Sequence, residues 1–337
     1  MARRYIKKHY PWSLRNWVQL AVFVLTIAIG IQFYYYVIQV SGIGDVTIPR
    51  PPGVEGFLPI GSLMAWKHFL FTGHWDMVHP AGMVIIGFAI LISWLLRKTF
   101  CGWFCPVGTL SEWLWRLGQR MFGRNFQFPK WLDIPLRSLK YILMAFFVYF
   151  AVVVASISYL KDFQETRYWI VSDIKMMYFF TEMSIGALII LLLLAVGSLF
   201  VRNFWCRYLC PYGALMGLFS MISPTRVVRD EEKCSNCGLC TKVCPAYLPV
   251  DEKPFIQSAE CTGCMNCTAI CPINETMTMQ TVGTKKNFWT LKSMSIAVTG
   301  SFVFLVVLAR IFGVWESTIT IEQIREIFPL IPYLNHT

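Results

Sequence analysis

Eight of the twelve cysteines form two copies of one spacing, C-x2-C-x2-C-x3-C-P. Thiolates at this spacing hold [4Fe–4S] clusters. Three closely spaced sulfurs bind one cluster, and the fourth, followed by proline, binds the other. The pattern therefore predicts two clusters. Their ligand sets are Cys234, Cys237, Cys240 and Cys271 for one, and Cys244, Cys261, Cys264 and Cys267 for the other.

Two other uses of dense cysteines fit this pattern less well. Zinc sites need four ligands each, often as separated C-x2-C pairs, and do not require the repeated C-x3-C-P ending. Disulfides belong to oxidising compartments, whereas thiols packed this closely are typical of a reducing one. The spacing thus favours iron–sulfur clusters over zinc or disulfides.

The remaining four cysteines form two C-x3-C-P pairs, Cys101/Cys105 and Cys206/Cys210, each preceded by an arginine at Arg97 or Arg202. The i,i+4 spacing predicts both sulfurs of a pair on one helix face, and the proline is expected to break the helix just past the second cysteine. If the pairs face each other, four thiolates form a third metal site, a candidate [4Fe–4S] cluster. Arg97, Arg202 and Arg207 would offset part of its charge. A redox-active dithiol and plain packing of small apolar side chains are the alternatives.

The composition predicts a membrane protein, because 56% of the residues are hydrophobic and only 15% are charged. Stretches of about 18 or more apolar residues predict membrane-spanning helices. Five spans are expected, at residues 17–40, 79–96, 136–159, 185–201 and 294–315. The cysteine pairs recur at a constant offset of 105 residues, which indicates two parallel repeats, each ending in a cysteine pair.

Basic residues predict the orientation. Lysine and arginine number 23 in segments 1–16, 97–140 and 202–292 but only 7 in segments 41–78, 161–183 and 310–337. Cytoplasmic segments carry the excess of such residues. The N-terminus and both cysteine-rich regions are therefore expected in the cytoplasm and the C-terminus outside. Membrane topology thus accounts for the net charge of +11 without nucleic acid.

These observations predict an α-helical polytopic membrane protein with an inserted bacterial ferredoxin-like α+β domain that holds two [4Fe–4S] clusters. The expected divisions are a membrane domain at 1–223, the cluster domain at 224–284, and a last span with a polar outer tail at 285–337. No nucleotide-binding glycine loop or nucleophile triad is present, so no catalytic residue is predicted.

Two membrane C-x3-C-P motifs followed by the double C-x2-C-x2-C-x3-C-P run resemble the NapH/NosR-type membrane polyferredoxins, a [4Fe–4S] quinol dehydrogenase family. The run Cys101-Gly-Trp-Phe-Cys105-Pro106 is especially similar to that family's first motif. The resemblance implies an electron-transfer subunit in a prokaryotic inner membrane. It would connect the quinone pool with other redox subunits, either ferredoxin-like proteins or cytochromes. Copper-handling CcoG-like proteins share part of this architecture, so a cupric reductase or a maturation factor for a respiratory metalloenzyme is the alternative.

Polar residues of the two expected outer loops are weaker candidates. His68, His74, Asp76 and His79 could move protons at a quinol site, because histidine titrates near neutral pH. An ordinary polar loop at the membrane surface is the favoured interpretation. Solvated loop charge is likewise expected for four acidic residues, Asp162, Glu165, Asp173 and Glu182.

Overall fold

The computed structural model describes residues 12–283 and 289–334. The basic residues Arg3, Arg4, Lys7 and Lys8, which contribute to the predicted orientation, lie outside this part of the chain. The chain divides into two compact units. Unit 1 draws on Met1–Phe23, Ala89–Met144 and Leu192–Phe302, and unit 2 on Val24–Phe88, Ala145–Leu191 and Val303–Thr337. All twelve cysteines belong to unit 1.

The unit boundaries fall within five helices of the described chain. These are α2 (Leu14–Ser41), α4 (Pro80–Leu95), α6 (Lys130–Val148), α10 (Ile185–Phe200) and α15 (Leu291–Ile311). Each of them overlaps one of the five predicted spans. Their apolar sequences, rather than strong caps, explain why they are long and continuous.

Among the described residues, three helices are long and apolar enough to cross a membrane. They are α2, α15 and α6 extended by a π-helical turn to Val154. A fourth span results if α9 (Ser172–Thr181) and α10, which are bent by 77° at their junction, are counted as one. Helix α4 has only 16 residues, about 24 Å at 1.5 Å per residue, against a hydrocarbon core of roughly 30 Å. The protein is therefore a membrane protein with three or four candidate spans, and the count of five stays a prediction.

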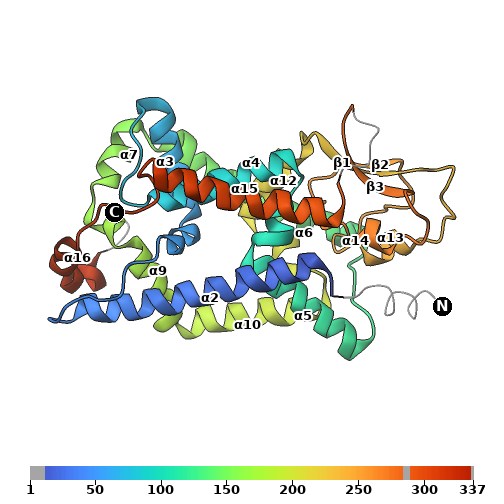
Figure 1. The fold of residues 1–337 in the computed structure, drawn as a ribbon. Coiled ribbons are helices and arrows are strands. Elements are labelled where there is room, and N and C mark those ends of the chain that lie inside the picture. The colour runs from blue at the N-terminus through green and yellow to red at the C-terminus, as the bar shows by residue number, and fades with distance from the viewer. Residues whose placement is uncertain (1–11, 284–288, 335–337) are drawn as a thin grey trace. The chain divides into compact units, whose positions relative to one another are not determined.

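Unit 1 contains a small antiparallel sheet beside two short helices (Figure 1). The strands are β1 (Thr225–Arg229), β2 (Phe255–Ile256) and β3 (Met277–Thr281), in the order β2-β1-β3, and the helices are α13 (Leu239–Val243) and α14 (Asn266–Ile270). Val227 on the central strand lies opposite both Ile256 and Met279. It packs in one apolar cluster with Cys240 and Cys244. The sheet thus positions the cysteine-bearing helices.

Other elements of unit 1 carry Cys101/Cys105 and Cys206/Cys210, which are called the membrane cysteine pairs below. They are a π-helical turn (Phe100–Phe104), α5 (Pro106–Phe122), α11 (Phe204–Tyr208) and α12 (Pro211–Met221). Helix α5 packs closely on α10, because the Cα of Gly118 faces the carbonyl oxygen of Leu199 without room for a side chain.

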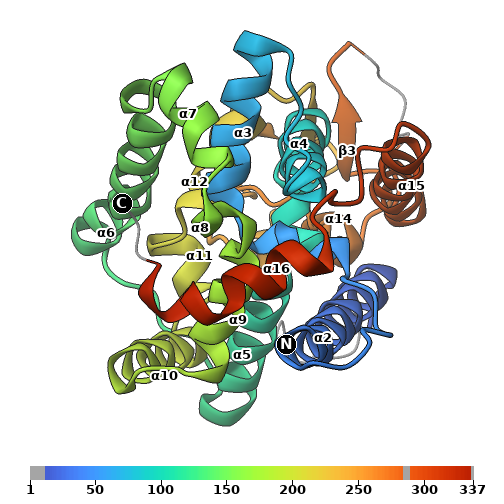
Figure 2. The ribbon, with the colours of Figure 1, turned by 90° about the vertical axis from the view of Figure 1, so that its left-hand side faces the viewer.

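Unit 2 is built from short helices that connect the long ones. They comprise a 3-10 turn (Pro52–Phe57), α3 (Pro59–Thr72), α7 (Ile157–Gln164), α8 (Arg167–Ile170), α9, α16 (Ile321–Ile327) and a final 3-10 turn (Phe328–Tyr333). The tail expected to be polar is instead partly apolar: Ile324, Ile327 and Ile331 are buried against Val171 and Ile174. Helix α16 accordingly lies across α8 and α9 (Figure 2).

Candidate functional site

The first membrane cysteine pair spans two elements. Cys101 lies in the π-helical turn, and Cys105 is the N-cap of α5, where Pro106 occupies the first helical position. The Cys105 Sγ accepts a hydrogen bond from the Gly108 amide at 3.4 Å. A Cβ at Gly108 would lie 2.6 Å from the Cys101 carbonyl oxygen, so only glycine fits there. The sequence Cys-Pro-x-Gly is therefore a helix start that holds a sulfur over backbone amides.

The second pair repeats this local geometry. Cys206 lies in α11, and Cys210 is the N-cap of α12, whose first position is Pro211. The Cys210 Sγ accepts from the Gly213 amide at 3.2 Å. The prediction that each pair shares one helix face is thus wrong. The proline begins a new helix, and the second cysteine caps it.

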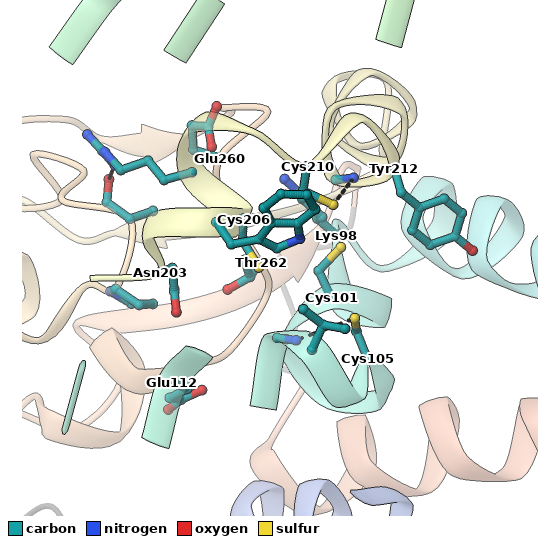
Figure 3. Close-up of a pocket in the computed structure, with 18 of the residues that line it drawn as sticks. Lys98, Cys101, Cys105, Glu112, Asn203, Cys206, Cys210, Tyr212, Glu260 and Thr262 are labelled. Atoms are coloured by element: carbon teal, nitrogen blue, oxygen red, sulfur yellow. Dashed lines mark hydrogen bonds between the residues drawn. The ribbon is translucent and has the colours of Figure 1, made fainter. Parts of the chain in front are cut away.

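All four membrane cysteines border one cavity of about 60 Å³. Figure 3 shows the sulfurs of Cys101, Cys105 and Cys210 directed towards the same space. Lys98 lies beside them, and Glu260 and Arg207 also line the cavity. Lys98 and Glu260 were not identified from the sequence. Lys98 directly follows Arg97, the arginine that the repeat pattern emphasises.

The arginines that precede the two membrane cysteine pairs, Arg97 and Arg202, bind backbone carbonyl oxygens outside the cavity. Arg97 is fully buried and donates to the carbonyl oxygens of Ser220, at 2.9 Å, and Ser258, at 2.7 Å. Arg202 donates to the Lys242 and Cys244 carbonyl oxygens at 2.9 and 3.1 Å. Neither lines the cavity, so the prediction that they offset the charge of a site there is wrong for both. Of the three predicted arginines, Arg207 alone lines it.

The eight remaining cysteines border two smaller cavities of about 20 Å³ each. One is lined by Cys234, Cys237, Cys240 and Cys271, and the other by Cys244, Cys261, Cys264 and Cys267. Helices α13 and α14 produce this grouping. Each carries a cysteine of one set within the helix and has a cysteine of the other set as its C-cap.

The membrane-cysteine cavity and the cavity beside Cys244 share part of their walls. Pro245, Ala246 and Thr262 line both. A Cβ at Gly102 would lie 2.7 Å from the Thr262 carbonyl oxygen, so the two loops are in close contact. The Trp103 indole also donates to the Gly263 carbonyl oxygen at 3.2 Å. The three cysteine sets are therefore arranged in series in space, with the Cys244 set in the middle.

Known families match the same segments. The 4Fe-4S binding domain family matches residues 78–125 and 183–228, which contain the two membrane cysteine pairs. The 4Fe-4S dicluster domain family matches residues 226–272. YccM from Escherichia coli K12, named as a candidate electron transport protein, is 42% identical over 97% of this chain and 94% of its own length. The chain belongs to the NapH/NosR-type family.

More distant members of this family differ in how much they share. The ferredoxin-type protein NapH of E. coli K12 is 28% identical over 56% of this chain and 61% of its own length. The regulatory protein NosR of Pseudomonas aeruginosa is 26% identical over 56% of this chain but only 26% of its own length. No solved structure matches the chain.

The chemistry of the three cysteine sets in this NapH/NosR-type protein fits iron–sulfur ligation. None of the twelve cysteines is in a disulfide. Within the described residues, no three His, Cys, Asp or Glu side chains converge as ligands of a single metal ion would. Burial raises the pKa of Cys101 to about 12 and that of Cys105 to about 11. Neutral thiols are therefore expected at pH 7 until a cation displaces their protons.

A second polar cluster lies in unit 2, where an ordinary polar loop at the membrane surface was the favoured prediction for His68, His74, Asp76 and His79. His74 is exposed, but His68, Asp76 and His79 are buried, so that prediction is wrong for these three. Asp173, for which solvated loop charge was predicted, is also buried and pairs with Arg50, so that prediction is wrong for this residue. The three other acidic loop residues, Asp162, Glu165 and Glu182, are exposed as predicted.

Proposed function

We propose that this protein relays electrons between the quinone pool and the redox partners of a respiratory chain through [4Fe–4S] clusters. Its membership of a ferredoxin-type family and its candidate spans establish the coarser role, iron–sulfur electron transfer in a membrane protein. One observation carries the finer proposal: Pro245, Ala246 and Thr262 are shared by the membrane-cysteine cavity and the adjacent ferredoxin cavity.

Three sets of four cysteines would hold the clusters. The sets are Cys101, Cys105, Cys206 and Cys210; Cys244, Cys261, Cys264 and Cys267; and Cys234, Cys237, Cys240 and Cys271. Such clusters, when bound, supply one-electron transfer at potentials set by charge and hydrogen bonding. The protein's part is to hold the sulfurs, exclude water and set the order of the sites. The membrane set lies at one end of that order, and the set with the exposed Cys237 lies at the other.

The orientation follows from the distribution of basic residues. We place both cysteine-rich regions on the cytoplasmic side, because their segments carry most of the lysines and arginines. The exposed position of Cys237 then suits electron exchange with a partner that approaches from the cytoplasm or with a neighbouring subunit. The membrane set suits exchange with the quinone pool.

Iron analysis and EPR of the full-length protein, purified anaerobically in lipid nanodiscs, test the cluster assignment. We expect about twelve irons per chain, because three cubanes hold four each. The Cys101→Ser/Cys206→Ser variant should retain about eight. A matched variant, Cys234→Ser/Cys271→Ser, should lose a different EPR signal and keep that of the membrane set. About eight irons in the unmodified protein would contradict the third cluster.

Quinol reduction tests the relay itself. Menaquinol or ubiquinol should reduce the clusters of the unmodified protein, and the Cys101→Ser/Cys206→Ser variant should lose this reaction while dithionite still reduces the other two clusters. Clusters inert to every quinol and quinone, with or without partner subunits, would overturn the proposal. Reduction of Cu(II) that depends on Cys101 and Cys206, without any reaction with quinol, would instead identify a cupric reductase.

A further inference from the structure

The two cysteine sets of the ferredoxin-like domain have the same spacing but different surroundings. One C-x2-C-x2-C-x3-C-P run repeats the other at an offset of 27 residues, from Cys234 to Cys261. Because the sulfurs are equivalent, a difference in reduction potential between two bound clusters has to come from the charge, hydrogen bonding and solvent exposure around them. The Cys234 set comprises Cys234, Cys237, Cys240 and Cys271, and the Cys244 set comprises Cys244, Cys261, Cys264 and Cys267.

Arg229 brings a positive charge to one set only. It is the last residue of β1, its side chain is 9% exposed, and its Nη1 donates to the Cys234 Sγ at 3.6 Å. The corresponding residue of the other half, 27 positions on, is Ile256. Ile256 is the last residue of β2, is buried and lines the cavity of the Cys244 set. One set thus has an apolar side chain where the other has a guanidinium.

The central strand of the sheet explains why the guanidinium serves a single set. Val227 and Arg229 are two residues apart on β1, and alternate residues of a strand share a face. Val227 lines the cavity of the Cys244 set. Arg229 lies opposite Met277, which lines the cavity of the Cys234 set. One face of β1 therefore presents valine to one set and arginine to the other.

Neutral hydrogen-bond donors do not distinguish the two sets, because each cavity is lined by one buried donor without another partner. Thr276 lines the cavity of the Cys234 set and Asn266 that of the Cys244 set. These residues are 1% and 5% exposed. Neither the Thr276 hydroxyl nor the Asn266 Nδ2 has a hydrogen-bond partner among the described residues. The difference between the sets therefore depends on charge.

The surroundings of the Cys244 set supply no net charge. Within the described chain, no charged side chain lines its cavity. Two ion pairs lie close to this set, Arg15 with Glu112 and Lys140 with Glu260. Each pair contains one positive and one negative group, so the fields of its members largely cancel.

Two carboxylates act against Arg229 at the Cys234 set. Asp251 lines the cavity and accepts a hydrogen bond from the Thr241 hydroxyl. Glu231 pairs with Nη2 of Arg229 at 2.8 Å, but its side chain is 58% exposed, so water and salt screen its charge more than that of the arginine. A carboxylate cannot donate to sulfur. Arg229 therefore has the stronger effect on the thiolate that it contacts.

We propose that Arg229 gives the Cys234 set a higher reduction potential than the Cys244 set, so that electrons collect beside the exposed Cys237. This inference rests on the cluster assignment within the proposed function. A positive charge at a sulfur stabilises the reduced, more negative cluster. Transfer of one electron from the Cys244 set to the Cys234 set oxidises the first, reduces the second, and makes or breaks no bond. Arg229 acts through Cys234, and it directs electrons from the membrane cysteines towards Cys237.

Potentiometric EPR of the full-length protein in nanodiscs, with dithionite as the reductant, tests this order without any quinol. Of the two signals that the Cys101→Ser/Cys206→Ser variant retains, the one sensitive to Arg229 should be reduced at the higher potential. Arg229→Gln should lower the reduction equilibrium of that signal about tenfold, or about 59 mV for one electron, and leave the others unchanged. Arg229→Lys should restore most of the potential, and Asp251→Asn should move the same signal to a higher potential.

Arg226→Gln is the matched control. It removes an arginine of the same strand whose guanidinium carbon lies 4.5 Å from the centre of the Phe255 ring and which lines none of the three cysteine cavities of the described chain. An unchanged midpoint in Arg229→Gln, an equal shift in Arg226→Gln, or an Arg229-sensitive signal at the lower potential would each overturn the inference. If Arg229→Gln does not retain its iron, Asp251→Asn decides, and a midpoint that does not rise counts against the inference. If no quinol reduces the unmodified protein, the relay from the quinone pool fails, and this titration still decides the order of the two potentials.

Discussion

The Nζ of Lys140 lies 2.6 Å from Oε1 of Glu260, the residue directly before Cys261. The lysine side chain is 0% exposed and the glutamate side chain 11% exposed. The pair ties α6 to the loop that carries one cysteine set, and the Tyr141 hydroxyl donates to the same carboxylate at 3.2 Å.

Loss of one member of this pair should destabilise unit 1. Lys140→Met leaves the Glu260 charge buried, and breaking a buried pair costs about 3–5 kcal/mol. We expect Lys140→Met to have a clearly lower apparent Tm than the unmodified protein. Thermal unfolding in detergent, monitored by circular dichroism, measures this difference. The double variant Lys140→Met/Glu260→Gln should recover part of the loss, because Glu260 no longer carries the charge that Lys140 balanced. An unchanged Tm for Lys140→Met would contradict this account of the pair.

Lys98 should raise the reduction potential of a cluster held by the membrane cysteines. Its positive charge borders the cavity and stabilises the reduced, more negative form. Lys98→Met should therefore lower the midpoint potential in an EPR redox titration, and Lys98→Arg should largely preserve it. Lys242→Met removes an exposed lysine of α13 as a control. An equal shift of the midpoint potential in Lys98→Met and Lys242→Met would show that the position of the lysine relative to the cavity does not matter.

Gly118 should tolerate no side chain. A Cβ there would lie 1.8 Å from the Leu199 carbonyl oxygen, so α5 and α10 would have to separate. Overpacking of this kind typically costs 1–3 kcal/mol, and Gly118→Ala should lower the apparent Tm. Gly300→Ala in α15 is the matched control, because nothing lies within 4 Å of the added carbon. Equal stability of the two variants would rule out the close packing of α5 on α10.

Glu112 should make the stability of unit 1 depend on pH in the acid range. The carboxylate is buried, yet ion pairs with Arg15, at 2.5 Å, and Arg116 lower its pKa to about 2. A carboxylate whose pKa is lowered in the folded state stabilises the fold at pH values above the pKa of about 4.3 that it has in the unfolded chain. That contribution, roughly 3 kcal/mol, is lost as pH falls from about 4.3 to 2. Glu112→Gln should be less stable at pH 7, and its Tm should change less over this pH window.

The cysteine sets could be predicted from sequence because their spacing is local. The sequence predicts the same groupings that line the three cavities, although the ligation itself stays a prediction. The conformation around Cys105 and Cys210 was missed, because i,i+4 spacing was interpreted as one helix. The following proline and glycine, which favour a helix start, were the available signal.

The buried charged group of unit 2, in which Arg50 pairs with both Glu55 and Asp173, could not be predicted from sequence. Glu55 and Asp173 are 118 positions apart, and neither belongs to a recognisable motif. Their burial depends on tertiary packing of α4, α9 and the 41–58 connection, which no local pattern encodes. His79 was identified as a candidate together with Asp76, but its contacts with Arg50 and Glu55 were not.

The crossed attachment of α13 and α14 has a consequence for biogenesis. Each helix joins a cysteine of one set to a cysteine of the other within five residues, Cys240 to Cys244 and Cys267 to Cys271. Iron inserted at either set therefore restrains both helices and prepares the other set. We expect loading of the two sites to be cooperative. Newly made or oxygen-damaged protein should then divide into fully loaded and empty molecules, with few that are half-filled.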